Sequence, residues 1–300
     1  MTTPAEPPTV RTTCAIVGGG PAGLVLGLLL ARAGVAVTVL EKHADFLRDF
    51  RGDTVHPTTL ALLDDLGLFD RFEAIPHSRV THVDLPDPEV TGVTWEKGRV
   101  AIGIPRDGYI QVAQLGPKGA DDAVRARGLD AFRADAAQLF PEAVTGVTGI
   151  GSMADVKHLD VRLDRLRRWH APGVLCIGDA AHAMSPVGGV GINLAVQDAV
   201  AAASILAPLL RSGGASGRAE ARALARIQRR RMVPTVVIQG MQRILHAALI
   251  MPAIRGRDLR PPSWVVKVVR QVPWLSALPA LAVGVGPRPE RAPRWARRPS

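Results

Sequence analysis

The sequence has few cysteines and few aromatic residues. The first argues against disulfide bonds, and the second argues against binding of nucleic acid. Only two of the 300 residues are cysteines, Cys14 and Cys176. Both lie in apolar runs typical of buried strands, so we expect reduced thiols, no disulfide and a cytoplasmic location. Aromatic residues make up 4% of the chain, which leaves few rings to stack on bases. Despite a net charge of +10, we therefore expect no nucleic acid as a partner.

The chain also lacks a convincing membrane segment. The N-terminal MTTPAEPPTVR has no apolar core of the signal-peptide type. The stretch from Pro234 to Ile254 is apolar, but it is interrupted by Gln239, Gln242, Arg243 and His246 and is too polar to span a bilayer. Because it is amphipathic and flanked by basic residues, the sequence leaves peripheral membrane contact open.

Several common catalytic patterns are missing. There is no CxxC or HExxH, and the eight histidines show no metal-ligand spacing, so we expect no metal site. There is also no GxSxG nucleophile elbow and no GK[ST] phosphate loop. His182 is interpreted as a packing residue. Arg229, Arg230 and Arg231 are interpreted as a solvated helix face or a helix-end charge cluster.

What is present begins with a βαβ unit. An apolar strand near Cys14–Val17 is followed by a helix at 21–32 and a strand at 35–41, which predicts a parallel sheet. The turn GGGPAG lies directly between the first strand and the helix. Gly18 permits a tight turn, Gly20 lets the backbone approach a pyrophosphate, and Gly23 lets helix and strand pack closely.

The same unit supplies further candidate contacts to a dinucleotide. The helix start, with Pro21 and Ala22, offers free N–H groups to phosphates. Glu41 would accept hydrogen bonds from the ribose hydroxyls, and Lys42 beside it belongs to the same candidate site. This first motif does not distinguish FAD from NAD.

The rest of the chain alternates between helical and strand patterns. Pro57 begins a helix that Gly67 ends. Residues 80–119 have the short alternating runs of an antiparallel sheet. A helix is predicted at 120–138, a strand in VKHLDVRLDRL (156–166), a buried strand at 173–177 and a long apolar helix at 192–210.

A second motif, GDAAHAMSPVGGVGINLAVQDA, covers residues 178–199 and leads from the buried strand into the long helix. Together with GGGPAG it resembles the second FAD fingerprint of flavin monooxygenases of the para-hydroxybenzoate hydroxylase type. The resemblance implies that Asp179, after Gly178, binds a ribityl hydroxyl and that Pro186 lies beside the isoalloxazine. It also implies contacts to the pyrimidine end of the ring from Gly189, Gly191, Ile192 and Asn193. A helix starting there would direct its positive end at the reduced flavin, which is anionic.

A third segment, DFRGDTVHPTTLALLDDLG, also matches the family, in which an arginine at the position of Arg51 reaches the cofactor. A solvated surface arginine is the alternative. The tail element ALAVGVGPRPE at 280–290 resembles the family as well.

The resemblance stops in the middle of the chain. Family members have a long segment between the Arg51 region and the later sheet, and it carries most of a substrate domain and an Asp-Gly motif. The only Asp-Gly pair here, Asp107 and Gly108, is interpreted as a β-turn. Because flavin hydroxylation needs a dry pocket, a shortened enclosure would leak. No catalytic side chain is assigned.

The sequence therefore predicts an α/β fold: a Rossmann-like FAD-binding domain with a mixed sheet, a reduced β-rich substrate domain and C-terminal helices. The predicted boundaries are 12–82 with 155–210 for the FAD-binding domain, 83–154 for the substrate domain, 211–288 for the helical region and 289–300 for a disordered tail.

The implied enzyme is a FAD-dependent monooxygenase that uses NADPH or NADH and hydroxylates an aromatic or polyketide-like small molecule. One alternative is a shortened homologue that acts as an uncoupled NAD(P)H oxidase. Another is a non-catalytic binding or assembly partner. The oligomeric state is not predicted.

Overall fold

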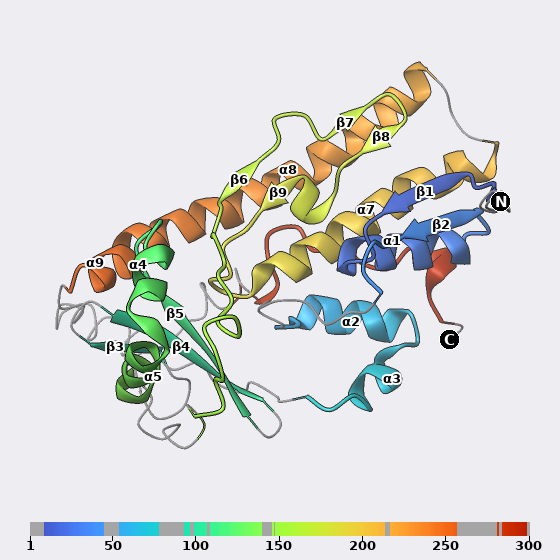
Figure 1. Cartoon of the computed structure of the whole chain (residues 1–300). Coiled ribbons are helices and arrows are strands. Elements are labelled where there is room, and N and C mark those ends of the chain that lie inside the picture. The colour runs from blue at the N-terminus through green and yellow to red at the C-terminus, as the bar shows by residue number, and fades with distance from the viewer. Residues whose placement is uncertain are drawn as a thin grey trace, which may run out of the picture. The chain divides into compact units, whose positions relative to one another are not determined.

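The computed structural model describes residues 9–44, 54–77, 93–96, 99–106, 109–139, 146, 148–213, 217–256, 281 and 284–298 (Figure 1). It describes only the backbone of 93–100, 104–106, 109 and 110 within these ranges. The chain forms two compact units. Unit 1 comprises Met1–Phe69, Arg162–Gln239 and Ala280–Ser300, and unit 2 comprises Asp70–Val161 and Gly240–Pro279. The helical region predicted as a separate part is thus divided between the two units.

Unit 1 begins with the βαβ arrangement that the sequence predicts. Strand β1 (Cys14–Val17) is followed by helix α1 (Pro21–Arg32) and strand β2 (Val37–Leu40). The two strands pair in parallel, from Cys14 opposite Val37 to Val17 opposite Leu40. Helix α1 begins with proline, whose fixed φ suits a first helical turn. It buries Leu29 and Leu30 completely.

Helix α7 (Val190–Arg211) forms the centre of the unit 1 core and packs against α1. Its inward face is rich in alanine, and four alanines have no exposed surface: Ala199, Ala201, Ala202 and Ala203. Small side chains let two helix backbones approach closely. Helix α8 (Arg218–Leu245) adds Leu224 and Ile227 to the same core. The predicted helix at 192–210 is therefore confirmed.

Shorter elements surround this core. Helix α2 (Pro57–Asp65) begins at the predicted proline. The short helix α3 (Phe69–Glu73) follows it in the sequence, where unit 1 ends and unit 2 begins. Strand β6 (Asp164–Arg165) pairs with β9 (His182–Ala183), and β7 (His170–Ala171) pairs with β8 (Val174–Leu175). The 3₁₀ turn η2 (Gly178–Ala180) lies between β8 and β9.

The long strand predicted at 156–166 was wrong. Residues 157–163 form neither helix nor strand, and only the two residues of β6 are paired. The apolar side chains of the alternating pattern, Leu159 and Val161, are 49% and 37% exposed. Alternation indicates a strand only where one face is buried, and neither of these side chains is buried.

The C-terminal segment also differs from the prediction, which placed a disordered tail at 289–300. Residues 284–298 pack on unit 1 and include the 3₁₀ turn η4 (Arg294–Ala296). Ala292 and Ala296 are each only 2% exposed. Arg32 Nη1 donates to the carbonyl oxygens of Leu66 and Ala296, both at 2.9 Å. Long-range contacts of this kind order a segment whose composition alone suggests disorder.

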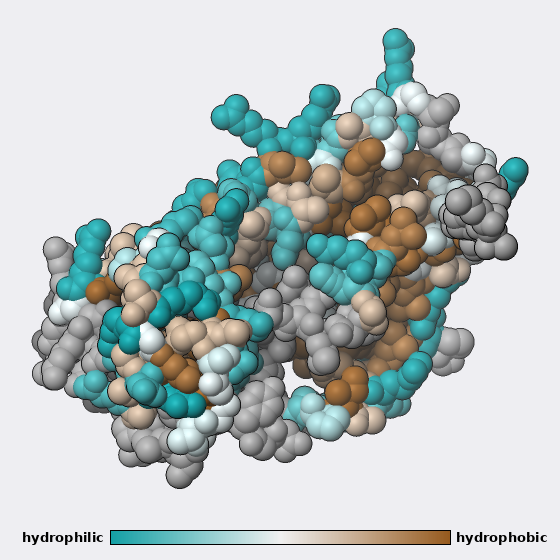
Figure 2. All heavy atoms as spheres, viewed as in Figure 1, coloured by the Kyte–Doolittle hydropathy of each residue, from teal (hydrophilic) through white to brown (hydrophobic). Residues whose placement is uncertain are grey.

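Unit 1 leaves part of its small parallel sheet uncovered. Figure 2 shows hydrophobic side chains on the face that unit 1 presents in that view. Val17 and Leu40, at the ends of β1 and β2, are 86% and 52% exposed. Parallel sheets are normally covered on both faces, so the cover over these two strand ends is incomplete within the part of the chain that the structure describes.

Unit 2 contains the antiparallel sheet that the sequence predicts. Its strands β3 (Val93–Glu96), β4 (Arg99–Arg106) and β5 (Tyr109–Leu115) follow one another in the sheet. The prediction of a β-turn at Asp107 and Gly108 lies outside the described residues. The helix predicted at 120–138 is two helices, α4 (Asp121–Ala126) and α5 (Gly128–Leu139). The break occurs because Gly128 has a φ of +83°, which a continuous helix does not allow.

Unit 2 also contains the end of α8, a π-helical segment, η3 (His246–Ile250), and α9 (Met251–Ile254). The last two continue α8, so that one helical run extends over Arg218–Ile254. This run and Val190–Arg211 are long and apolar enough to cross a membrane by length and composition. Core helices pass the same test, and 72% of the α7 window is buried inside the protein against 22% for the longer run.

Candidate functional site

The glycine-rich turn after β1 has the geometry predicted for it. Gly18 has a φ of +108°, which favours glycine, and its N–H donates to Leu40 O at 2.8 Å. A Cβ on Gly23 would lie 2.0 Å from Gly18 O, so only glycine allows α1 to pack this closely. A Cβ on Gly20 would meet no heavy atom within 4 Å. The turn therefore has no room for a side chain at Gly23, whereas the described residues leave the space beside Gly20 empty.

Glu41 closes this turn from the end of β2. Its Oε2 accepts the N–H of Gly19 at 2.7 Å, and its Oε1 accepts the N–H of His43 at 3.0 Å. Both carboxylate oxygens therefore take part in holding the turn. Lys42 is exposed. The contacts of Glu41 and Lys42 with a ribose stay predictions.

The first turn of α1 is suited to an anion. The helix begins at Pro21 and Ala22, has no side-chain cap and carries no acidic residue in its first turn. The N–H groups of a first turn have no partner within the helix, and the helix dipole adds positive potential. With the open space at Gly20, these features fit the pyrophosphate of a dinucleotide.

The second fingerprint lies next to the first in the structure. Gly178 has a φ of +58°, and a Cβ there would lie 3.2 Å from the Cβ of Ala22 and 3.1 Å from that of Ala195. Gly178 therefore lies between the start of α1 and helix α7. Asp179, the next residue, is exposed and makes no hydrogen bond with any residue that the structure describes. Its carboxylate is thus available to accept a cofactor hydroxyl.

Helix α7 begins where the resemblance places the flavin ring. Gly189 caps it with a φ of +60°, and a Cβ there would lie 2.8 Å from Thr54 Cβ. Gly191 and Ile192 belong to the first turn, whose N–H groups can reach an anionic ring edge. Pro186, in the preceding loop, is exposed. The contacts of these residues with the flavin stay predictions.

Asn193 has a role that the sequence did not predict. Its Oδ1 accepts the His56 N–H at 2.9 Å and the Thr59 hydroxyl at 2.7 Å. Its Nδ2 donates to Thr54 O at 3.1 Å and to Gly189 O at 3.2 Å. The side chain is only 4% exposed and fastens the segment before α2 to the start of α7. The prediction for Arg51 lies outside the described residues.

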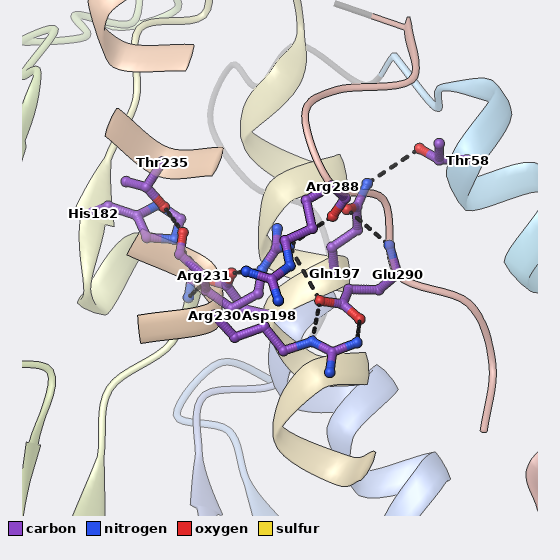
Figure 3. Close-up of polar contacts among 10 residues, drawn as sticks. Thr58, His182, Gln197, Asp198, Arg230, Arg231, Thr235, Arg288 and Glu290 are labelled. Atoms are coloured by element: carbon purple, nitrogen blue, oxygen red, sulfur yellow. Dashed lines mark hydrogen bonds and ion pairs between the residues drawn. The ribbon is translucent and has the colours of Figure 1, made fainter. Parts of the chain in front are cut away.

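A buried charge network of His182, Asp198 and Arg231 contacts the second fingerprint (Figure 3). Asp198 and Arg231 have no exposed surface, and His182 is 1% exposed. Asp198 Oδ2 contacts His182 Nε2 at 2.6 Å, and Asp198 Oδ1 accepts from Arg231 Nε at 2.8 Å. The interpretation of Arg231 as part of a solvated face was wrong, because this arginine is paired inside the core.

Glu290, from the C-terminal segment, extends the network. It binds Arg230 through two bonds, of 2.7 Å and 2.6 Å, and this pairing raises the pKa of Arg230. The Glu290 N–H donates to Gln197 Oε1 at 3.3 Å. Gln197, Asp198 and Glu290 were missed in the sequence. The available signal was the pair Gln197-Asp198 in an otherwise apolar helix, because a charge at a core position needs a partner.

Two hollows lie on unit 1 among the residues that the structure describes. Unit 1 has a hollow of about 410 Å³ beside Ala33 and Trp295, and another of about 460 Å³ beside Arg222 and Arg229. Neither is lined by a fingerprint residue. The assignment therefore depends on the glycine geometry and the two helix starts. Among the described residues no group of three or more His, Cys, Asp or Glu side chains could hold a metal ion.

Comparison with known proteins identifies the family. The model of the FAD binding domain family matches residues 11–91 and 75–234. The 6-methylpretetramide 4-monooxygenase of Streptomyces rimosus is 26% identical over 405 aligned positions, covering 95% of this chain and 96% of that protein. The p-hydroxybenzoate hydroxylase of Acinetobacter baylyi is 34% identical over 76 residues, 24% of this chain and 19% of the relative.

A solved structure has a similar fold. The crystal structure of PqsL from P. aeruginosa, in complex with 2-aminobenzoylacetate, superposes with a TM-score of 0.60 at 17% identity, covering 82% of this chain and 98% of that one.

The alignments also agree with a shortened middle. The Streptomyces alignment has 405 positions and this chain has 300 residues, so more than a hundred positions face no residue here. The two family matches meet at residues 75–91, after the Arg51 region and before the sheet, where the sequence predicts the missing segment. Since the family model matches most of the chain, the protein belongs to the FAD binding domain family and is a FAD-dependent monooxygenase of the para-hydroxybenzoate hydroxylase type.

Proposed function

We propose that the protein hydroxylates an aromatic or polyketide-like small molecule, with NADPH or NADH as the electron donor. In the overall reaction NAD(P)H, a proton, O₂ and the substrate give NAD(P)⁺, water and the hydroxylated product. The observation that carries this proposal is the similarity to the Streptomyces 6-methylpretetramide 4-monooxygenase over 95% of the chain. The meeting of both fingerprints at Gly178 and Ala22 supports it.

FAD, when bound, supplies electron transfer and oxygen activation, and the residues of the chain hold it and set its electrostatic surroundings. The N–H groups at the start of α1 bind the pyrophosphate beside Gly20, where there is room for it. Asp179 accepts a hydrogen bond from the ribityl chain. The start of α7 at Gly189–Ile192 directs N–H groups and the positive helix end to the ring edge that gains negative charge on reduction.

A second candidate function is an uncoupled NAD(P)H oxidase, which converts NAD(P)H, O₂ and a proton into NAD(P)⁺ and hydrogen peroxide. The shortened middle favours it, because more than a hundred positions of the Streptomyces relative have no counterpart here. An incomplete substrate enclosure admits water and releases peroxide before it reacts with a substrate.

The test begins with the visible spectrum of the purified protein before and after addition of FAD. Anaerobic addition of NADPH, and separately of NADH, is expected to bleach the flavin bands. Under air, a panel of phenols and tetracyclic polyketides is then tested for hydroxylated product and for hydrogen peroxide per NAD(P)H consumed. Bleaching with peroxide alone would support the oxidase. Bound flavin that neither donor bleaches would contradict both redox functions.

A further inference from the structure

We propose that Asp198 and Glu290 are positioning residues for the FAD-binding loop Gly178–His182, so that the C-terminal segment takes part in cofactor binding. This inference depends on FAD binding and not on the substrate or electron donor proposed above. It is carried by the buried contacts that connect this loop to helix α8 and to the C-terminal segment (Figure 3).

Asp198 holds the loop at both ends of its first turn. Its Oδ2 accepts the Gly178 N–H at 3.1 Å and contacts His182 Nε2 at 2.6 Å. The ring of His182 in turn packs on Trp169, with the ring centroids 5.2 Å apart. Because Asp179 directly follows Gly178, the direction of its carboxylate depends on how Gly178 is held. Asp198 thus positions the residue that the family resemblance assigns to the ribityl chain.

Arg231 fixes the other oxygen of Asp198 and connects it to the C-terminal segment. Its Nε donates to Asp198 Oδ1 at 2.8 Å, and its Nη1 lies 3.5 Å from Glu290 Oε1 and donates to Arg288 O at 3.4 Å. Glu290 is itself held by the two bonds from Arg230. A displacement of the C-terminal segment would therefore change the position of Arg231 and of the carboxylate that holds the loop.

Stability alone does not account well for this arrangement. Burying a charged pair has a large desolvation cost, and well-packed apolar residues of similar volume often stabilise a core as much or more. Asp198 and Arg231 have no exposed surface, so both bear that cost in full. Charged hydrogen bonds differ from apolar packing in that they fix orientation: the Asp198 carboxylate accepts from donors of the loop and of α8 in defined directions. A fixed orientation is needed where a neighbouring side chain must point at a ligand, and the neighbouring side chain here is that of Asp179.

The same contacts give an electrostatic consequence. Asp198, on helix α7, accepts the N–H of Gly178 in the loop that leads to the flavin site, and a negative charge at this position disfavours a reduced, anionic flavin. Removing that charge should make the flavin midpoint potential more positive. A residue that only maintained the fold would not shift the potential in a correctly folded protein.

The experiment compares Asp198→Asn and Glu290→Gln with Asp135→Asn. Asp135 is a buried carboxylate of unit 2 that pairs with Arg127 at 2.7 Å and takes no part in the loop contacts described above. Each protein is titrated with FAD by flavin fluorescence, its potential is measured against reference dyes, and its melting temperature is measured without FAD. We expect Asp198→Asn to raise the Kd for FAD about tenfold or more, with a more positive potential. We expect Glu290→Gln to raise the Kd about threefold, and Asp135→Asn to leave it unchanged.

Two outcomes would overturn the proposal. The first is a folded Asp198→Asn protein that melts at a lower temperature but keeps the wild-type Kd and potential, because the network would then only maintain the fold. If Asp198→Asn does not fold, the Glu290→Gln variant decides, and a wild-type Kd for that variant would contradict a role of the C-terminal segment. None of these measurements needs a substrate or NAD(P)H, so a failure of the proposed hydroxylation would leave this inference intact.

Discussion

Substituting Gly20 and Gly23 separately distinguishes cofactor contact from packing within a single turn. In Gly23→Ala the new Cβ would lie 2.0 Å from Gly18 O, and Cβ atoms essentially never come closer than 3.0 Å to a neighbour. Helix α1 and strand β1 must therefore separate by about 1 Å, and overpacking of this kind costs about 1–3 kcal/mol. For a unit of this size that lowers the melting temperature of the FAD-free protein by roughly 2–12 °C.

Gly20→Val is expected to weaken FAD binding and to change the stability of the FAD-free protein only slightly. Nothing lies within 4 Å of a Cβ at Gly20, and its backbone is extended, with φ −74° and ψ 178°, so valine fits the FAD-free protein. As this position caps α1, the loss of stability should stay under about 1 kcal/mol. The side chain would occupy the space that the pyrophosphate needs. Losing one charged hydrogen bond there, about 1.5–3 kcal/mol, raises the Kd for FAD about 10- to 150-fold.

The assay is a thermal melt without FAD followed by a FAD titration, for both variants and for Gly116→Val. Gly116 is exposed in unit 2, and a Cβ there would also meet no atom within 4 Å, so that variant should match the wild type in both measurements. Normal FAD affinity of Gly20→Val would refute the assignment of the turn to a pyrophosphate. A melting temperature as low as that of Gly23→Ala would refute the open space at Gly20.

Three further predictions follow from single residues. Asp179→Ala should raise the Kd for FAD about 5- to 150-fold without changing the FAD-free melting temperature, because this exposed carboxylate has no described partner; equal affinity in a titration would exclude the ribityl contact. Asn193→Ala should destabilise the FAD-free protein by about 1–3 kcal/mol, because buried groups before α2 lose their partner; an unchanged urea midpoint would argue against this clamp. Burial raises the pKa of the Cys14 thiol, so its alkylation, followed by mass spectrometry, should have a higher pH midpoint than that of a free cysteine peptide, and an equal or lower midpoint would contradict that burial.

The sequence predicts best those parts of the fold whose signals are local. The parallel unit of β1, α1 and β2 is visible as two apolar runs around a glycine turn. Helix α7 is visible as a long apolar segment that follows a glycine-rich loop, and its observed bounds differ from the prediction by only a few residues. In each case the residues that determine the structure lie within one or two turns of one another, so no knowledge of distant contacts is needed.

The errors arose where distant residues decide the structure. Arg231 looks like one member of a solvated basic run, because its partner Asp198 lies 33 positions earlier. The C-terminal segment looks disordered, because Arg32 and Arg230 that hold it lie far away in the chain. The break between α4 and α5 is a different kind of miss, since Gly128 was visible and only its positive φ was not. Charge pairing in a core therefore cannot be deduced from composition and periodicity alone.

The cofactor contacts and the shortened part of the chain lie in different units, so the shortening should affect FAD affinity and product yield differently. The FAD contacts inferred at Gly18–Gly23, Glu41 and Gly178–Asn193, and the network that supports them, all lie in unit 1. The two family matches meet at residues 75–91, which belong to unit 2. Because the shortening does not touch the cofactor contacts, it should leave FAD affinity intact and instead lower the yield of hydroxylated product per NAD(P)H. Inserting the relative's segment at this junction should then increase that yield without changing the Kd for FAD. A parallel change in both would mean that the cofactor site extends beyond unit 1.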